Sequence, residues 1–94
     1  MSVISKEKQE KIKEEILRVL FENSPKAMFT SEVSSQIVRD EEFTLRLLEN
    51  LNSQKLINKI NKNSDGKDYL TRKRWVLASK TYDIYKKLLS NHQR

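Results

Sequence analysis

The chain has 94 residues, a length that suits a single domain. Nineteen lysines and arginines stand against 13 aspartates and glutamates, and the resulting net charge of +6 favours nucleic acid or another polyanion as a partner. Cysteine is absent, which excludes disulfides, thiolate metal sites and a thiol nucleophile. We find neither a membrane-spanning apolar run nor a signal-peptide pattern, and expect a cytoplasmic protein.

The first predicted element is a helix over residues 5–21. Its apolar residues recur at helical spacing and cover about half of the circumference; they are Ile12, Ile16, Leu17, Val19, Leu20 and Phe21. One interpretation places this whole arc in the core of the chain, and the alternative assigns part of it to a dimer contact. Pro25 ends the helix because proline lacks the amide donor.

Two short helices should follow an extended segment over residues 27–29. Thr30 or Ser31 is expected to cap the first of them, which runs to about Val38. Asp40 should cap the second, which runs to about Gln54 and would bury Phe43, Leu47, Leu48 and Leu51. A connection this short is typical of a helix-turn-helix.

Residues 56–62 and 69–77 have the composition of two β-strands, and Asp65-Gly66 between them predicts a type I′ hairpin turn. The strand partners expected from that turn are Lys62 with Tyr69, Ile60 with Thr71, Asn58 with Lys73, and Leu56 with Trp75. This register would place Lys59, Asn61, Arg72 and Arg74 on one face, and Lys62 and Lys73 on the other.

The excess positive charge is concentrated in this hairpin. Residues 58–80 carry seven cations and two acids, so they contribute +5 of the net +6. Such lysines could simply protect a solvated edge from aggregation, or they could contact phosphates. We interpret Trp75 as a core residue where the hairpin meets the helices, although a base-stacking role is the alternative.

Ser79 is expected to cap a last helix, with residues 91–94 frayed at its end. Its apolar arc is again wide and includes Ile84. If the terminal helices pair in a homodimer, the residues expected at the interface are Ile12, Ile16, Leu17, Phe21, Tyr82, Tyr85, Leu88 and Leu89.

The order helix, strand, helix, helix, hairpin, helix resembles the winged-helix DNA-binding family, and within it small MarR-like archaeal or archaeal-virus regulators. The segments that carry the resemblance are MFTSEVSSQI, TLRLLENLNSQKLI and WVLASKTYDIYKKLL, although Ala78 and Thr81 stand where threonine and glycine are usual. The implied fold class is α+β, a winged helix-turn-helix domain over residues 1–94. Its recognition helix would span about 41–54 and its wing about 56–77.

The resemblance implies that the recognition helix enters the major groove and that the wing contacts an adjacent groove or phosphates. Its expected outward residues are Glu42, Arg46, Glu49, Asn50 and Ser53. Arg46 could read guanine and Asn50 adenine, whereas the two acids would repel phosphate and suit a merely solvated helix face. The full set of candidate DNA-binding residues is Arg46, Asn50, Ser53, Lys59, Asn61, Lys62, Lys67, Arg72, Lys73 and Arg74.

No catalytic constellation is evident. His92 is the only histidine and Gly66 the only glycine, so neither a histidine-based triad nor a glycine-rich phosphate loop can form. We therefore expect no enzyme activity, no cofactor, no metal and no small-molecule ligand. The predicted function is double-stranded DNA binding by a homodimeric transcription regulator. The alternative is a winged-helix adaptor for protein partners, which Leu45 beside the acids Glu41, Glu42 and Glu49 would favour.

Overall fold

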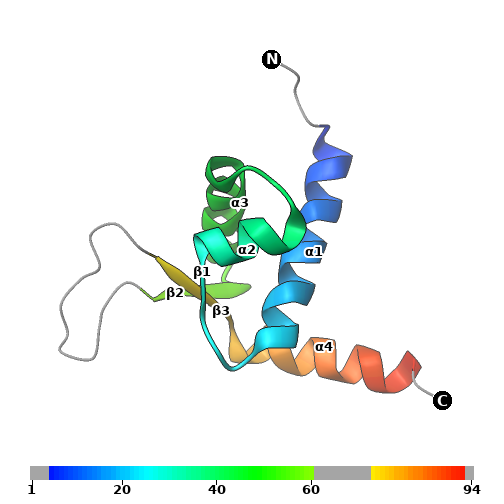
Figure 1. The fold of residues 1–94 in the computed structure, drawn as a ribbon. Coiled ribbons are helices and arrows are strands. Elements are labelled where there is room, and N and C mark those ends of the chain that lie inside the picture. Colours follow the sequence, from blue (N-terminus) through cyan, green and yellow to red (C-terminus); the bar gives the residue numbers. More distant parts are fainter. Residues whose placement is uncertain (1–4, 61–72, 93–94) are drawn as a thin grey trace, which may run out of the picture.

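A computed structural model describes residues 5–60 and 73–92 of the chain. Within these residues, four helices and a small antiparallel sheet follow one another in the predicted order, and the sheet lies to one side of the helices (Figure 1). The elements are α1 (Lys6–Asn23), β1 (Met28–Phe29), α2 (Thr30–Ile37), α3 (Glu41–Ser53), β2 (Ile57–Ile60), β3 (Arg74–Leu77) and α4 (Ser79–His92). The α+β winged helix-turn-helix architecture expected from the sequence is confirmed.

Helix α1 supplies one side of the core. Ser5 caps it by accepting a hydrogen bond of 3.2 Å from the backbone nitrogen of Lys8. Its buried residues face α2, α3 and β3, and they are Ile12, Ile16, Val19 and Leu20. The helix runs past Phe21 to Asn23, whose side-chain amide donates to the carbonyl oxygen of Val19 at 2.9 Å.

The start of α2 differs from the prediction. Phe29, not Thr30 or Ser31, occupies the N-cap position, and its backbone nitrogen donates to the carboxylate of Glu32 at 2.9 Å. Thr30 is the first helical residue, and its hydroxyl oxygen accepts a hydrogen bond from the indole of Trp75. The predicted cap was wrong because the helix already begins at Thr30, whose hydroxyl contacts Trp75.

Asp40 caps α3 as predicted, since its carboxylate accepts a hydrogen bond of 3.0 Å from the backbone nitrogen of Phe43. Leu47, Leu48 and Leu51 are buried as expected, whereas Phe43 is only partly buried. Thr44 is fully buried, and its hydroxyl is satisfied there by donating to the carbonyl oxygen of Asp40 at 2.8 Å.

The sheet has the strand order β1-β3-β2, with both pairs antiparallel. The predicted hairpin register was wrong: Asn58 pairs with Val76, and Trp75 pairs with Lys59. The partner of Asn58 is Val76, three residues beyond the predicted Lys73. Because side chains alternate between the two faces of a strand, a shift by an odd number of residues changes which residues of β2 and β3 share a face. The Asp65-Gly66 turn and the other predicted partners, in residues 61–72, lie outside the described residues.

Burial explains the observed register. Ile57 and Trp75 are fully buried and Leu77 is nearly so, which requires all three side chains on the same face of the sheet. The predicted register would have placed Leu56 opposite Trp75 and turned Ile57 outward. As a result, Lys59 shares the inner face with Trp75 and Arg74 lies on the outer face, so these two cations are separated rather than aligned.

Helix α4 begins at Ser79, so Ala78 takes the cap position, and its carbonyl oxygen accepts from the backbone nitrogen of Tyr82 at 2.9 Å. The helix continues to His92, further than the predicted fraying at residue 91. Its first turns lie near the end of α1, and the rest extends away from the body (Figure 1). Across the described residues, no helix combines the length and apolarity needed to cross a bilayer.

Candidate nucleic-acid interface

The outward face of α3 presents Arg46 to solvent. Arg46 is exposed, and its guanidinium carbon lies 5.9 Å from the ring centroid of Phe43. Because the stripe that contains Leu47, Leu48 and Leu51 faces the core, Arg46 points away from it on the same side as Glu42 and Ser53, which are also exposed. An arginine in this position can donate two parallel hydrogen bonds to a guanine edge.

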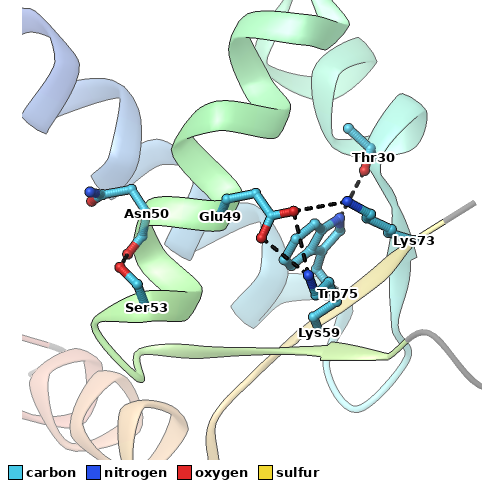
Figure 2. Close-up of polar contacts among 7 residues, drawn as sticks. All are labelled: Thr30, Glu49, Asn50, Ser53, Lys59, Lys73 and Trp75. Atoms are coloured by element: carbon cyan, nitrogen blue, oxygen red, sulfur yellow. Dashed lines mark hydrogen bonds and ion pairs between the residues drawn. The ribbon is translucent and has the colours of Figure 1, made fainter.

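Glu49 connects α3 to the base of the wing. Its carboxylate lies 2.9 Å from the ammonium nitrogen of Lys73 and 3.3 Å from that of Lys59 (Figure 2). The side chains of Glu49 and Lys73 are 37% exposed and that of Lys59 is 27% exposed, so the cluster is partly withdrawn from water. The aliphatic stem of Lys59 carries its ammonium to within 5.9 Å of the Trp75 ring centroid. We call these three charged residues the wing-root cluster.

Two opposing effects act on the Glu49 carboxyl. Partial burial disfavours its charged form, but hydrogen bonds from Lys73 and Lys59, with their positive charges, outweigh that penalty and lower the pKa of Glu49 below its ordinary value. Glu49 is therefore firmly ionised at neutral pH. The acid that seemed on the sequence to face outward and repel phosphate is in fact paired with two wing cations.

Asn50 lies on the flank of α3 that faces α1. Its side-chain oxygen accepts hydrogen bonds from the ammonium of Lys13 at 2.7 Å and from the amide of Gln54 at 2.9 Å. The side-chain hydroxyl of Ser53 donates to the backbone carbonyl oxygen of Asn50 at 2.7 Å (Figure 2). Both oxygen lone pairs of the Asn50 amide are thereby engaged, which leaves its NH₂ group as the free end. Bidentate reading of adenine would require Asn50 to release Lys13 or Gln54.

The wing residues predicted from sequence divide into three groups. Lys59 and Lys73 lie together in the wing-root cluster. Arg74 lies on the outer face of the sheet, with its guanidinium carbon 5.9 Å from the ring centroid of Phe29. Asn61, Lys62, Lys67 and Arg72 lie outside the described residues. Trp75 is fully buried and is therefore a core residue, not a stacking platform.

The predicted dimer residues are also distributed unevenly. Ile12 is 5% exposed and Ile16 is 0% exposed, so both side chains lie in the core of the single chain. Leu17, Phe21 and Tyr82 are partly buried against that core. Leu88 and Leu89 are 50% and 45% exposed on α4, and Ile84, which was not among the predicted interface residues, is 54% exposed.

An aromatic contact joins α4 to the end of α1. The Phe21 ring centroid lies 5.1 Å from that of Tyr82 and 5.7 Å from that of Tyr85. Burial, helped by the nearby negative charge of Glu14, raises the pKa of Tyr85 above its ordinary value. The same apolar arc of α4 continues beyond this contact into the exposed Leu88 and Leu89.

Sequence reasoning missed two features of this interface. It did not predict that Lys13 contacts the recognition helix, and it interpreted Glu49 as an acid exposed to solvent without ion-pair partners. Both interactions join residues on different elements, Lys13 to Asn50 across 37 positions and Lys73 to Glu49 across 24. For Glu49 the available signal was charge complementarity between distant segments, which does not identify partners, and for the neutral Asn50 there was no such signal. Within residues 5–60 and 73–92, no three histidine or acidic side chains gather as metal ligands would.

Comparison with solved structures reveals the same fold in bacterial regulators. The Staphylococcus aureus MepR–DNA complex superposes with a TM-score of 0.69 at 17% identity, covering 94% of this chain and 72% of that one. The E41A variant of Lactococcus lactis ZitR superposes with a TM-score of 0.67 at 18% identity, covering 99% of this chain and 59% of that one. MepR in a DNA-binding conformation superposes with a TM-score of 0.66 at 19% identity, covering 84% of this chain and 55% of that one. MepR is a transcription regulator of a multidrug efflux pump.

No protein-family model matches the chain, and no curated protein matches its sequence. The structural likeness at this low identity defines the fold: a winged helix-turn-helix that resembles the MarR-family regulators MepR and ZitR. The chain spans between about half and three quarters of the length of these solved structures, from 55% of MepR in its DNA-binding conformation to 72% of the chain in the MepR–DNA complex.

Proposed function

We propose that this chain binds double-stranded DNA as a transcription regulator, with α3 in the major groove and the wing against the sugar-phosphate backbone. The observation that carries the proposal is the placement of exposed Arg46 on α3 one helical turn from Glu49, where Lys59 and Lys73 join the wing to the helix. The arrangement offers a base-reading side chain and phosphate-binding cations on adjoining elements. The fold shared with the MepR–DNA complex supports this docking mode.

The proposed contacts have distinct roles. Arg46 would read a base edge, while Ser53 would contact the DNA from the same face of α3. Arg74, together with the wing residues Asn61, Lys62, Lys67 and Arg72, would supply phosphate contacts, and Lys59 and Lys73 would add to them only when they leave Glu49. Asn50 would donate through its free NH₂ group, because its oxygen is held by Lys13 and Gln54. A DNA-binding regulator of this kind would be a cytoplasmic protein.

The proposal includes a homodimer formed through α4. Ile84, Leu88 and Leu89 continue the arc that packs against Phe21, and an exposed apolar row of this kind is suited to a second copy of the same helix. Two recognition helices related by a two-fold axis would then contact half-sites about one DNA turn apart. Leu17, Phe21, Tyr82 and Tyr85 would support this contact from its buried side.

Duplex titration tests the proposed function. Wild-type protein and Arg46→Ala should be titrated into labelled duplexes selected from a random pool, at about 50 and 200 mM salt. We expect salt-sensitive binding, weakened by about 1–3 kcal/mol on loss of Arg46. Arg18→Ala is the matched control, because Arg18 pairs with Glu15 and Glu22 on α1. If the wild type binds no duplex at the lower salt concentration, the proposal is wrong.

A protein-interaction adaptor was the alternative suggested by Leu45. Leu45 is partly buried against the core, so it does not provide the exposed apolar contact that such a role would need. The exposed apolar residues lie on α4 instead, where they suit the dimer. No observation on α3 therefore favours the adaptor over DNA binding.

A further inference from the structure

The three acids of α3 have different environments. Glu41 and Glu42 lie in the first turn, where they face the positive end of the helix dipole and are exposed. Glu49 lies two turns further along, and its carboxylate contacts both Lys59 and Lys73. Removing a dipole-facing acid and removing Glu49 would change the net charge equally, so comparing the two removes the effect of net charge alone.

The Glu49 carboxylate contacts both lysines, as a phosphate oxygen could. Carboxylate and phosphate oxygens are the same kind of acceptor for an ammonium group, and each forms short charge-assisted hydrogen bonds. Lys59 and Lys73 both lie within 3.3 Å of a Glu49 oxygen, so one anion is held by two cations. The cluster carries a net charge of +1, two positive charges less one negative, and an approaching phosphate meets half the charge that the lysines alone would present.

The contact also fixes where the lysines lie. Lys59 extends along the inner face of the sheet over Trp75, and Lys73 immediately precedes β3, so Glu49 draws both strands of the wing toward α3. Figure 2 shows the carboxylate joined to both ammonium groups, with the indole beside them. A lysine freed from this contact could extend into solvent and meet phosphates over a wider range of positions.

We infer that Glu49 is a specificity-determining residue: it withholds Lys59 and Lys73 from phosphates and thereby limits sequence-independent DNA binding. This inference rests on the proposed DNA-binding function. Affinity for a random duplex comes mainly from non-specific phosphate contacts. When Glu49 restrains two of the lysines that could make such contacts, binding depends more on base contacts from α3, including that of Arg46. Glu49 is in this sense an internal competitor of the DNA backbone.

The decisive variants are Glu49→Gln and Glu42→Gln. Glutamine keeps the size of the side chain and removes one negative charge from the same helix in each case. Binding to a random-sequence duplex is measured by fluorescence anisotropy over a series of salt concentrations. We expect Glu49→Gln to bind about threefold or more tightly than Glu42→Gln, with a salt dependence steeper by about 0.9 in log K per log salt, equivalent to one additional phosphate contact.

A second background separates release of the lysines from loss of repulsion. In Lys59→Met plus Lys73→Met, methionine keeps an apolar stem but removes each ammonium. Glu49→Gln in that background should bind no more tightly than Glu42→Gln in the same background. An equal gain with and without the two lysines would mean that Glu49 acts by simple repulsion, and would overturn the inference.

The possible failures are distinguishable. If the wild type and all variants fail to bind any duplex at low salt while remaining folded by circular dichroism, the proposed function and the inference both fall. If the wild type binds DNA and Glu49→Gln behaves as Glu42→Gln does, only the inference falls. A folded Glu49→Gln variant with tighter, lysine-dependent binding supports both.

Discussion

The indole nitrogen of Trp75 donates a hydrogen bond of 2.8 Å to the hydroxyl oxygen of Thr30, 45 residues earlier in the chain. Both residues are buried, with Trp75 at 0% and Thr30 at 9% exposure. The bond joins β3 to the first residue of α2, and so fixes the wing to the helix-turn-helix (Figure 2). A buried indole N–H requires a partner, and Thr30 supplies it.

Thr30→Val should therefore destabilise the protein by about 1–3 kcal/mol, because it leaves the Trp75 N–H buried without its acceptor. Urea denaturation measures the change in the free energy of unfolding. Thr30→Ser, which keeps the hydroxyl, is the control and should lose less. In a Trp75→Phe background the penalty of Thr30→Val should largely disappear, and a penalty of the same size there would contradict the assigned hydrogen bond.

Val38 provides a second test of local structure. It ends α2 in the left-handed conformation, with φ 55° and ψ 53°, and is 85% exposed. A β-branched residue is disfavoured there, whereas glycine adopts this conformation readily. Val38→Gly should raise the free energy of unfolding by about 0.5–1 kcal/mol, after allowing for the greater backbone freedom that glycine has when unfolded. The control is Gln36→Gly, inside the same helix, which should be destabilising.

The lowered pKa of Glu49 predicts a pH-dependent contribution to stability. Because the folded-state pKa lies below the ordinary value of 4.5, ionised Glu49 stabilises the protein above pH 4.5, and this contribution is lost as the pH falls through the folded value. The pairs are partly exposed, so we expect a difference of at most about 1 kcal/mol between wild type and Glu49→Gln at pH 7. Urea denaturation from neutral to acid pH measures it; a difference independent of pH would contradict the ion pairs.

The apolar row on α4 predicts self-association. At tens of micromolar, light scattering coupled to size exclusion should give about twice the chain mass of 11.2 kDa. Ile84→Glu plus Leu89→Glu should produce a folded monomer, because both side chains are exposed in the single chain and would place charges in the interface. Ser90→Glu, also exposed on α4, adds charge on the opposite face and should remain dimeric. A monomeric wild type would exclude the dimer.

Element order was predictable from the sequence because its signals are local. The α3 cap at Asp40 depends on a backbone nitrogen three residues away, and the burial of Leu47, Leu48 and Leu51 follows from helical spacing. The break after α1 follows from Pro25, and the concentration of cations in residues 58–80 is a property of composition. These features predicted a winged helix with a basic wing and a recognition helix that displays Arg46.

The tertiary structure alone decided which of these residues meet. It set the register of β2 and β3, because Ile57, Trp75 and Leu77 had to share the buried face, and this placed Lys59 apart from Arg74. It also brought the Thr30 hydroxyl into a hydrogen bond with Trp75 and the side-chain oxygen of Asn50 into one with Lys13. In the same way it paired both Lys59 and Lys73 with Glu49. A hydrogen bond or ion pair between distant segments depends on how the helices and sheet pack together, and residue spacing along the chain does not encode that packing.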